Sequence, residues 1–441
     1  PENIQTVLSC LRGAGFRAVP VGGCVRDLLL GQTPHDWDIA TSATPEEMLS
    51  VFDAYKTLEI GQNGAKHGTI TVIMAHSSIE VTTFRQDGTY SDGRRPDSVC
   101  FSRTLENDLA RRDFTINAMC LAENGDIIDL FSGRQDLKNG IIRAIGTPDC
   151  RFREDSLRIL RALRFAASLG FEIEPQTANS MRCHAGLLST LSAERMRAEL
   201  EKLLCAPNCT QVLLTYREII FSVLPELRPT SGRIQQADYY CEDVYTHIAH
   251  AVRVAPPRAL LRMALLLTGI GKPVCTDGNG HFFGHTAQNA ALAEDILRRL
   301  KFSNAARERV LFLVQQQDLP LYEADQIEMK KLLSKYSFEA IRDLLAVQRA
   351  DVMAQQSDIA KQRLAHLDRT EHLLQSIAAQ QPPLNRAQLA VSGRDLIAAG
   401  ILPGPQLGAL LNLLLQRVLE EALPNEAGVL LAYVRAYQLA E

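Results

Sequence analysis

Near residue 140 the sequence changes from segments typical of β-strands to segments with helical periodicity, and this change narrows the possible folds. Four short segments before it have the character of β-strands, at 19–23, 36–41, 69–76 and 78–85. Almost every later stretch has helical periodicity, beginning with 154–171, which we expect to stop at Gly170. Because strands and helices are segregated rather than alternating, the pattern favours an α+β fold. We expect a small N-terminal head with a mixed β-sheet and helices, followed by an elongated all-α neck, body and tail.

The 441 residues are enough for three or four domains of ordinary size. Breaks rich in Pro or Gly interrupt the helical part, at 225–232, 271–284, 381–384 and 400–408. We expect four parts along the chain: a head at 1–140, a neck at 141–205, a helical body at 206–325 and a helical tail at 326–441.

The overall charge does not by itself suggest a nucleic-acid partner, because 47 basic residues stand against 51 acidic ones, a net of −4. An apolar fraction of 46% excludes a disordered chain. Two local runs are basic: 151–164 has five arginines against two acids, a net of +3, and 298–309 has a net of +4. Such runs can contact RNA phosphates, and a solvated helix face is the alternative.

The spacing of the cysteines and the length of the apolar segments indicate where in the cell the protein is located. The ten cysteines are scattered, with one close pair at Cys205 and Cys209, so neither a zinc site nor a disulfide framework is expected. The N-terminal residues contain no apolar segment of the signal-peptide type, and the richest apolar stretches are too short to span a bilayer. We expect a cytoplasmic protein with no membrane association.

Asp36 and Asp38 are two residues apart in an expected strand, so both carboxylates would lie on one face. Two carboxylates completed by water and phosphate oxygens suit Mg²⁺, which can activate a hydroxyl and stabilise leaving pyrophosphate. Trp37 would point to the opposite face as packing. Two exposed aspartates at a strand end are the alternative.

Gly22 and Gly23 form a turn that leads into an expected helix from Cys24. Backbone N–H groups at such a turn can hold a triphosphate, and Arg26 can add positive charge there. A plain strand–turn–helix with a surface pair between Arg26 and Asp27 is the alternative.

The segment RRDFTINA at 111–118 places charges beside apolar residues. Arg112 can hold a phosphate with two hydrogen bonds, and Asp113 can accept hydrogen bonds from ribose hydroxyls. A capped helix start with a surface ion pair is the alternative.

Glu154, Asp155 and Arg158 open the first long helical stretch. At a spacing of three, Asp155 and Arg158 would share a helix face and present an acceptor beside donors. Cytosine and adenine both carry a donor next to an acceptor, whereas guanine and uracil present the reverse, so one such pair can select CTP and ATP. A simple ion pair within the helix is the alternative.

The order and spacing of these motifs resemble those of the class II nucleotidyltransferases, a family of CCA-adding enzymes and bacterial poly(A) polymerases. The matching residues are Gly22-Gly23-x-Val25-Arg26-Asp27, Asp36-x-Asp38 and Arg111-Arg112-Asp113-Phe114-Thr115. The resemblance implies that Asp36 and Asp38 are catalytic and hold Mg²⁺. It implies nucleotide binding by Gly22, Gly23, Arg26, Arg112, Asp113, Asn117, Asp155, Arg158, Arg161 and Arg164. Supporting roles are expected for Glu80, Glu154 and Arg111, with an outward-facing strand residue as the alternative for Glu80.

The helical body and tail extend the resemblance. Segment 245–318 resembles a degenerate HD-type domain, in which Thr268-Gly269 stand where an active phosphohydrolase has an adjacent His-Asp metal pair. The remaining candidate ligands are His247, His281, His285 and Asp318. We therefore expect a scaffold without metal-dependent hydrolase activity. Segment 389–426 resembles the tail of the same family, which would grip the tRNA elbow.

The resemblance implies a tRNA nucleotidyltransferase that adds or repairs the 3′-terminal CCA from CTP and ATP, without a nucleic-acid template and with release of pyrophosphate. The expected partners are nucleoside triphosphates and tRNA, at its 3′ end, acceptor stem and elbow, and the protein would be a monomer or homodimer. The loop at 86–98 would move when specificity changes from C to A. An A-adding enzyme, a CC-adding enzyme and a bacterial poly(A) polymerase are alternatives with the same motifs. A non-catalytic RNA-binding protein is a more distant one.

Overall fold

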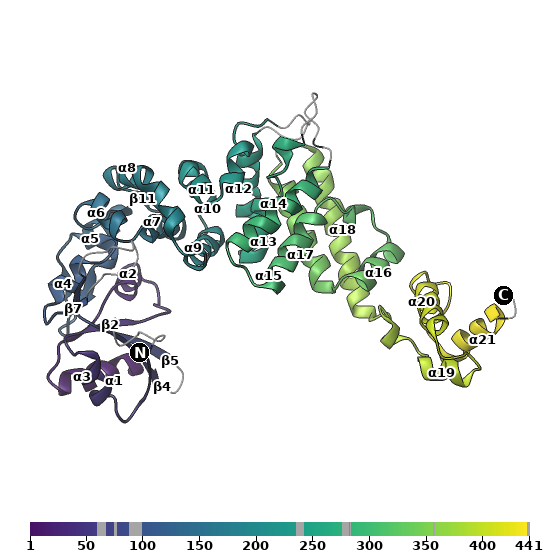
Figure 1. Cartoon of the computed structure of the whole chain (residues 1–441), viewed down its shortest axis with the longest axis horizontal. Helices are drawn as coiled ribbons and strands as arrows, with labels where there is room; N and C mark the ends of the chain where they lie inside the picture. The colour runs from purple at the N-terminus through teal and green to yellow at the C-terminus, as the bar shows by residue number, and fades with distance from the viewer. Residues whose placement is uncertain are drawn as a thin grey trace. The chain divides into compact units, whose positions relative to one another are not determined.

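The computed structural model describes residues 1–59, 68–74, 77–87, 99–234, 242–275, 282, 284–355 and 358–438 (Figure 1). The chain divides into two compact units, Pro1–Arg228 and Pro229–Glu441. Within the described ranges, every named strand belongs to the first unit, and the second unit is helical. This confirms the predicted α+β class. The division into four functional parts stays a prediction.

A mixed sheet forms the centre of the N-terminal part. Within the described residues it has five strands in the order β1-β2-β5-β4-β3. They are β1 (Ala18–Pro20), β2 (Asp38–Thr41), β3 (Lys56–Glu59), β4 (Thr69–Met74) and β5 (Ser77–Thr83). β2 and β5 run parallel, and the other neighbours are antiparallel. Alternation along β4 and β5 buries Ile70, Val72, Ile79 and Val81, because side chains two apart on a strand point the same way.

Helices and a hairpin cover both faces of this sheet. They are α1 (Glu2–Gly13), α2 (Gly23–Leu29), α3 (Pro45–Val51), α4 (Leu105–Ala110) and the antiparallel strands β8 (Met119–Leu121) and β9 (Ile127–Asp129). Leu8 and Leu11 of α1 and Met48 of α3 belong to one core with Ile70 and Ile79, in line with the position of both helices beside the strands in Figure 1. The opposite face shares a second core with α4 and the hairpin. Packing on both faces holds the start of β2 in a defined place.

Short helices follow the sheet within the first unit. They are α5 (Gly133–Asn139), α6 (Pro148–Glu154), α7 (Leu157–Leu169), α8 (Pro175–His184), α9 (Ala193–Cys205), α10 (Cys209–Thr215) and α11 (Arg217–Val223), with a parallel pair of strands, β10 (Ile141–Ile142) and β11 (Glu172–Ile173). Gly170 ends α7 in the left-handed conformation, as its sequence position predicts.

The predicted single helix over 154–171 is wrong at its start, because Asp155 and Ser156 separate α6 from α7. Asp155 is extended, with φ −146° and ψ 101°. Its carboxylate accepts a hydrogen bond from the Leu157 backbone N–H at 3.1 Å, and the Ser156 hydroxyl donates to the Leu187 carbonyl at 3.3 Å. Short polar side chains that bond locally in this way compete with helical backbone bonding.

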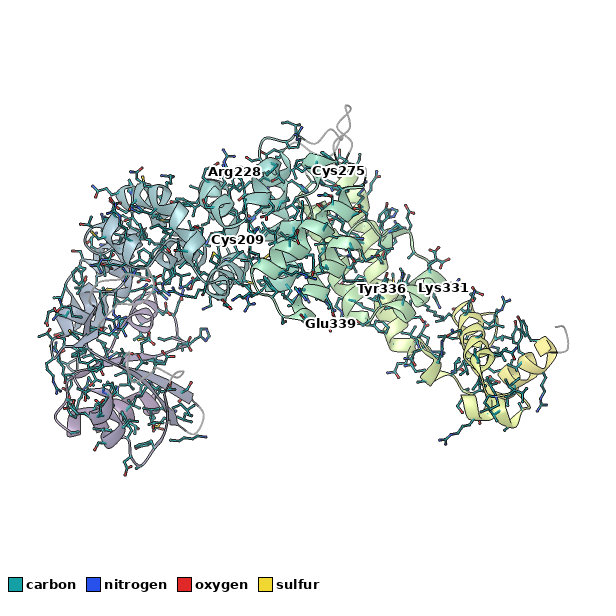
Figure 2. All side chains as sticks on the ribbon, viewed as in Figure 1. Cys209, Arg228, Cys275, Lys331, Tyr336 and Glu339 are labelled. Atoms are coloured by element: carbon teal, nitrogen blue, oxygen red, sulfur yellow. The ribbon has the colours of Figure 1, made fainter. Side chains whose placement is uncertain are left out.

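The second unit consists of helices from Val244 onward. They are α12 (Val244–Val254), α13 (Ala259–Leu267), α14 (His285–Arg299), α15 (Asn304–Gln315), α16 (Gln326–Lys335), α17 (Phe338–Met353), α18 (Asp358–Gln380), α19 (Gly393–Ala398), α20 (Pro405–Leu419) and α21 (Ala427–Gln438). The last three share a core of their own. Lys331 of α16, marked in Figure 2, pairs with Glu420 at 2.9 Å, and Lys330 pairs with Glu421 at 2.6 Å. These pairs join α16 to the end of α20.

The proposed HD-like segment packs closely at its centre. A Cβ atom at Gly269 would lie 2.6 Å from Ile248 Cδ1 and 2.9 Å from Val244 Cγ1, so this position has no room for a carboxylate. His247 Nε2 instead lies 2.8 Å from Asp351 Oδ1, and His285 lies 3.7 Å from Asp318. His281 lies outside the described residues. Throughout the part of the chain that is described, every helix is too short or too polar to cross a bilayer.

Candidate active site

Three carboxylates lie near the start of β2. Asp38 opens this strand, and Glu80 of β5 is its direct partner in the parallel pairing, so both side chains stand on the same face. Asp36 precedes the strand, which corrects the prediction that it lies within it. Trp37 packs against the core that contains Ile39, as predicted.

The negative charges of these carboxylates repel one another. Although Asp38 is solvent-exposed, partial desolvation of its carboxylate raises its pKa; Arg112 opposes this rise and Asp36 reinforces it. Partial burial likewise raises the pKa of Glu80, with Asp38 and Asp36 acting in the same direction. A bound cation would relieve this repulsion.

The donor set fits a hard divalent cation. Among the described residues, no three His, Cys, Asp or Glu side chains are placed to hold a metal ion by themselves. Mg²⁺ rarely uses an all-protein cage and is commonly held by one or two carboxylates together with substrate phosphates. Asp36 and Asp38 therefore have the chemistry for Mg²⁺ when a triphosphate supplies the other oxygens.

Gly22 lies against one of these carboxylates, that of Asp38. Its φ of +83° and ψ of −133° are accessible to glycine and strained for other residues. A Cβ atom there would lie 2.8 Å from Arg112 Nη1 and 3.7 Å from Asp38 Oδ2. The glycine turn thus brings bare backbone between a guanidinium and a carboxylate, and Gly23 begins α2 directly after it.

A buried acid, Asp108 of α4, holds both arginines of the RRD motif. Its carboxylate pairs with Arg111 at 2.6 Å and with Arg112 at 3.1 Å, and the residue is 0% exposed. Burial would raise the pKa of Asp108, but Arg112 and Arg111 hold it below its usual value. Arg112 Nε is buried without a hydrogen-bond partner in the described structure. Sequence reasoning missed Asp108, although its spacing of three and four residues from the arginines was a usable signal.

A chain of hydrogen bonds links α2 to α7 through the segment after α4. Arg26 bonds to Asp27 at 2.7 Å and to Asn117 Oδ1 at 2.7 Å. Asn117 donates in turn to Asp113, whose other oxygen accepts from Arg161 at 2.7 Å. Although burial acts against it, the Arg161 charge helps to lower the pKa of Asp113 to about 2. The structure brings these four predicted site residues together, and the Arg26–Asp27 pair that was the alternative interpretation is present as well, although both side chains are largely buried.

Phe165 lies beneath three of the predicted arginines and was not predicted. The guanidinium carbons of Arg26, Arg161 and Arg164 lie 5.1, 5.4 and 4.1 Å from its ring centre. These distances are those of cation–π contacts. Arg164 also pairs with Glu199 of α9 at 2.6 Å, a further residue that sequence reasoning missed.

Glu154, Asp155 and Arg158 do not share one helix, because the break after α6 separates them. Arg158 bonds to Glu154 at 2.6 Å and to the Arg111 carbonyl at 2.9 Å. Asp155 instead pairs with Arg195 of α9 at 2.7 Å. The helical spacing argument for Asp155 and Arg158 was therefore wrong, although both lie in the same part of the unit.

The five arginines of the basic run at 151–164 all have partners in the protein. Their contacts are Arg151–Glu154, Arg153–His184, Arg158–Glu154, Arg161–Asp113 and Arg164–Glu199. In the run at 298–309, Arg298 and Arg307 pair with Glu294, and Arg309 pairs with Asp343. Most of the loop at 86–98, from residue 88 onward, lies outside the described residues.

Comparison with protein families matches three parts of the chain. Residues 18–143 match "Poly A polymerase head domain", residues 170–229 match "Probable RNA and SrmB- binding site of polymerase A", and residues 281–434 match "tRNA nucleotidyltransferase domain 2 putative". These matches agree with the resemblance inferred from the motifs.

Whole-chain comparisons point the same way. The CCA-adding enzyme of Levilactobacillus brevis is 35% identical over 441 residues, covering 98% of this chain and 97% of that enzyme. That of Leuconostoc citreum is 34% identical over 434 residues, covering 98% and 95%. The crystal structure of the Bacillus stearothermophilus CCA-adding enzyme in complex with CTP has a TM-score of 0.74 at 29% identity, covering 100% of this chain and 98% of that one. The chain therefore belongs to the CCA-adding enzyme family.

Proposed function

We propose that this protein adds or repairs the 3′-terminal CCA of tRNA, using CTP and ATP without a nucleic-acid template and releasing pyrophosphate. Similarity to enzymes of that name over nearly the whole chain supports the activity. The observation that carries the proposal is the convergence of Asp38, Glu80, Arg112 and Gly22 at the start of β2. A role in tRNA processing would place the protein in the cytoplasm.

Asp36 and Asp38 would hold Mg²⁺, with Glu80 beside them. When bound, the ion lowers the pKa of a hydroxyl and neutralises phosphate charge. Arg112 lies against Gly22 and Asp38, so its guanidinium can contact a triphosphate that lies over the glycine turn. Asp108 fixes Arg112 from behind, which lowers the cost of ordering that side chain when nucleotide binds. The tRNA 3′ hydroxyl then attacks the α-phosphate in line, and pyrophosphate leaves.

Base selection would use Asp155 as the acceptor for the amino group that cytosine and adenine share. Arg158, anchored to Glu154 and to the Arg111 carbonyl, would supply a donor from α7. The network from Arg26 through Asn117 and Asp113 to Arg161 joins this base-reading part to the glycine turn. Positions of triphosphate and base would therefore be set by one connected group of side chains.

The experiment that tests the proposal uses three tRNA transcripts, ending before CCA, after one C and after CC. Each is incubated with Mg²⁺ and CTP, ATP or both, and the products are resolved on a sequencing gel. Completion of CCA on the shortest transcript supports the proposal. Addition of A to the CC transcript alone identifies an A-adding enzyme, arrest at CC identifies a CC-adding enzyme, and long A tails identify a poly(A) polymerase. Absence of incorporation with all three transcripts indicates a non-catalytic RNA-binding protein.

A further inference from the structure

Phe165 of α7 collects positive charge from two helices. The guanidinium carbon of Arg164 lies 4.1 Å from the centre of its ring, that of Arg26 lies 5.1 Å away and that of Arg161 lies 5.4 Å away. Arg161 and Arg164 belong to α7 itself, whereas Arg26 comes from α2, the helix that follows the glycine turn. The ring is therefore a point of contact between α2 and α7.

The position of this ring is fixed by its surroundings. Only 5% of Phe165 is exposed, and its ring meets that of Phe114 edge to face, with centres 5.9 Å apart and planes at 84°. Phe114 is fully buried and directly follows Asp113, which belongs to the hydrogen-bonded link between α2 and α7. A ring packed in this way keeps its negative faces in one place for the guanidinium groups.

Three guanidinium groups at one ring repel one another. Each has a carboxylate partner at 2.6 to 2.7 Å, in the pairs Arg26–Asp27, Arg161–Asp113 and Arg164–Glu199. Burial nevertheless lowers the pKa of Arg164, and the charge of Arg161 acts in the same direction, although Glu199 opposes it. An aromatic face stabilises a cation without adding negative charge, so it does not repel a triphosphate as a further carboxylate would.

The arginines at the ring also keep hydrogen-bond donors for a ligand. A guanidinium has five N–H donors in a planar fork. Among the described residues, Glu199 accepts from Nε of Arg164, and Asp113 accepts from Nε of Arg161 and lies 2.7 Å from its Nη2. These contacts leave further N–H groups on both arginines, and such groups can bind phosphate oxygens in pairs.

We propose that Phe165 is a positioning residue for the triphosphate of the bound nucleotide. Its ring holds the three guanidinium groups by cation–π contacts, so that their remaining donors meet the phosphates together. This inference rests on the proposed function. It separates phosphate positioning from base reading, because Arg158 is anchored by Glu154 and by the Arg111 carbonyl instead.

The test changes the electrons of the ring and leaves its size nearly unchanged. Phe165 is replaced by mono-, di- and trifluorinated phenylalanine through nonsense suppression, because each fluorine weakens the negative face of the ring. We expect KM for CTP and for ATP to rise stepwise, to about tenfold in the trifluorinated protein. The ratio of kcat/KM for CTP to that for UTP and the melting temperature should stay at their wild-type values.

Three further variants separate the cation–π contact from packing. Phe52 is the matched control, since it is 1% exposed in the core of the sheet and packs edge-on against Tyr55. Trifluorinated phenylalanine at position 52 should leave KM unchanged. Arg164→Gln removes the nearest cation, so fluorination of Phe165 should have a smaller effect in that background. Phe165→Leu should raise KM at least as far as trifluorination does, because it removes the ring.

An unchanged KM in the trifluorinated protein would overturn the inference. If only Phe165→Leu raised KM, the ring would be ordinary packing, which also contradicts it. A changed preference among bases at constant KM for CTP would assign the ring to base reading instead. Calorimetric titration with CTP, without tRNA, provides a second readout, in which the affinity should fall stepwise with fluorination. If wild type binds CTP but transfers no nucleotide, the proposed function fails, while this titration still decides the inference.

Discussion

At position 22, both the backbone conformation and the close approach of Arg112 require glycine. Gly22→Ala would put a side chain on a positive-φ backbone that essentially only glycine adopts, at a cost of about 1–3 kcal/mol, and would push a methyl group to 2.8 Å from Arg112 Nη1. We expect the variant to unfold at lower temperature and to lose nucleotide transfer almost completely. Gly31 is the matched control, since its φ is +72° and a Cβ there meets nothing within 4 Å. Gly31→Ala should lose some stability from its positive φ and keep its activity; equal loss of activity in both would contradict the steric argument.

The ionised carboxylate of Asp38 lowers the stability of the folded state, as its raised pKa implies. The folded state holds the proton more tightly than the unfolded state, so ionisation of Asp38 destabilises the fold at pH 7. Asp38→Asn should abolish transfer yet raise the melting temperature at pH 7 in a metal chelator. The gain should shrink as the pH falls toward about 4, where the unfolded carboxyl also becomes protonated. Thermal unfolding at pH 7 and at about pH 4 checks this, with the exposed Asp53→Asn as control. A gain of equal size at both pH values would argue against it.

Candidate catalytic and nucleotide-binding residues could be recognised from the sequence where they cluster in short segments, as at 22–27, 36–38 and 111–117. The residues that hold them in place could not. In the sequence, Phe165 cannot be distinguished from an ordinary core residue. Its role depends on three arginines from two helices. Glu199 and Arg195 act on α7 and on Asp155 through tertiary contacts that no local spacing indicates.

At the scale of single elements, local chemistry explains where helices begin. Thr44 accepts a hydrogen bond from the Glu47 backbone N–H at 3.3 Å, and Glu47 accepts from the Thr44 N–H at 2.7 Å, which is a capping box at the start of α3. Thr44→Ala should destabilise the protein by about 1 kcal/mol. Chemical denaturation measures this directly. Ser50→Ala, at an exposed position inside α3, should be neutral or slightly stabilising, and an equal loss in both variants would rule out the cap as the cause.

Strands and most helices could be predicted because their signals are periodic and local. Four strands of the five-stranded sheet lie within a few residues of the predicted segments, whereas β3 was not predicted. The interruption between α6 and α7 could not be predicted, since the polar residues 153–156 also suit the exposed start of an amphipathic helix. Its cause is the local bonding of Asp155 and Ser156, stabilised by Arg195 and by the Leu187 carbonyl from later in the chain.

At the scale of the whole molecule, two compact units with separate cores should unfold as separate cooperative steps. Scanning calorimetry should show two transitions. Asp113→Asn should move only one of them, because it removes the partner of Arg161 in the first unit, at a cost of about 3 kcal/mol. The contribution of Asp113 exists above its unfolded pKa and disappears as the pH falls through about 2. A single transition that shifts as a whole would show that the two units unfold together.

The internal pairing of the arginines at 151–164 has a thermodynamic consequence for RNA binding. Association with RNA gains entropy when phosphates exchange condensed small ions for protein cations. Arg161 and Arg164 each neutralise one carboxylate of their own chain, and Arg151 and Arg158 share the carboxylate of Glu154. The run therefore brings less net charge to that exchange than five separate arginines would. Affinity for tRNA should then depend on ionic strength less steeply than the number of arginines suggests, and shape and hydrogen bonding supply a larger share of the binding free energy.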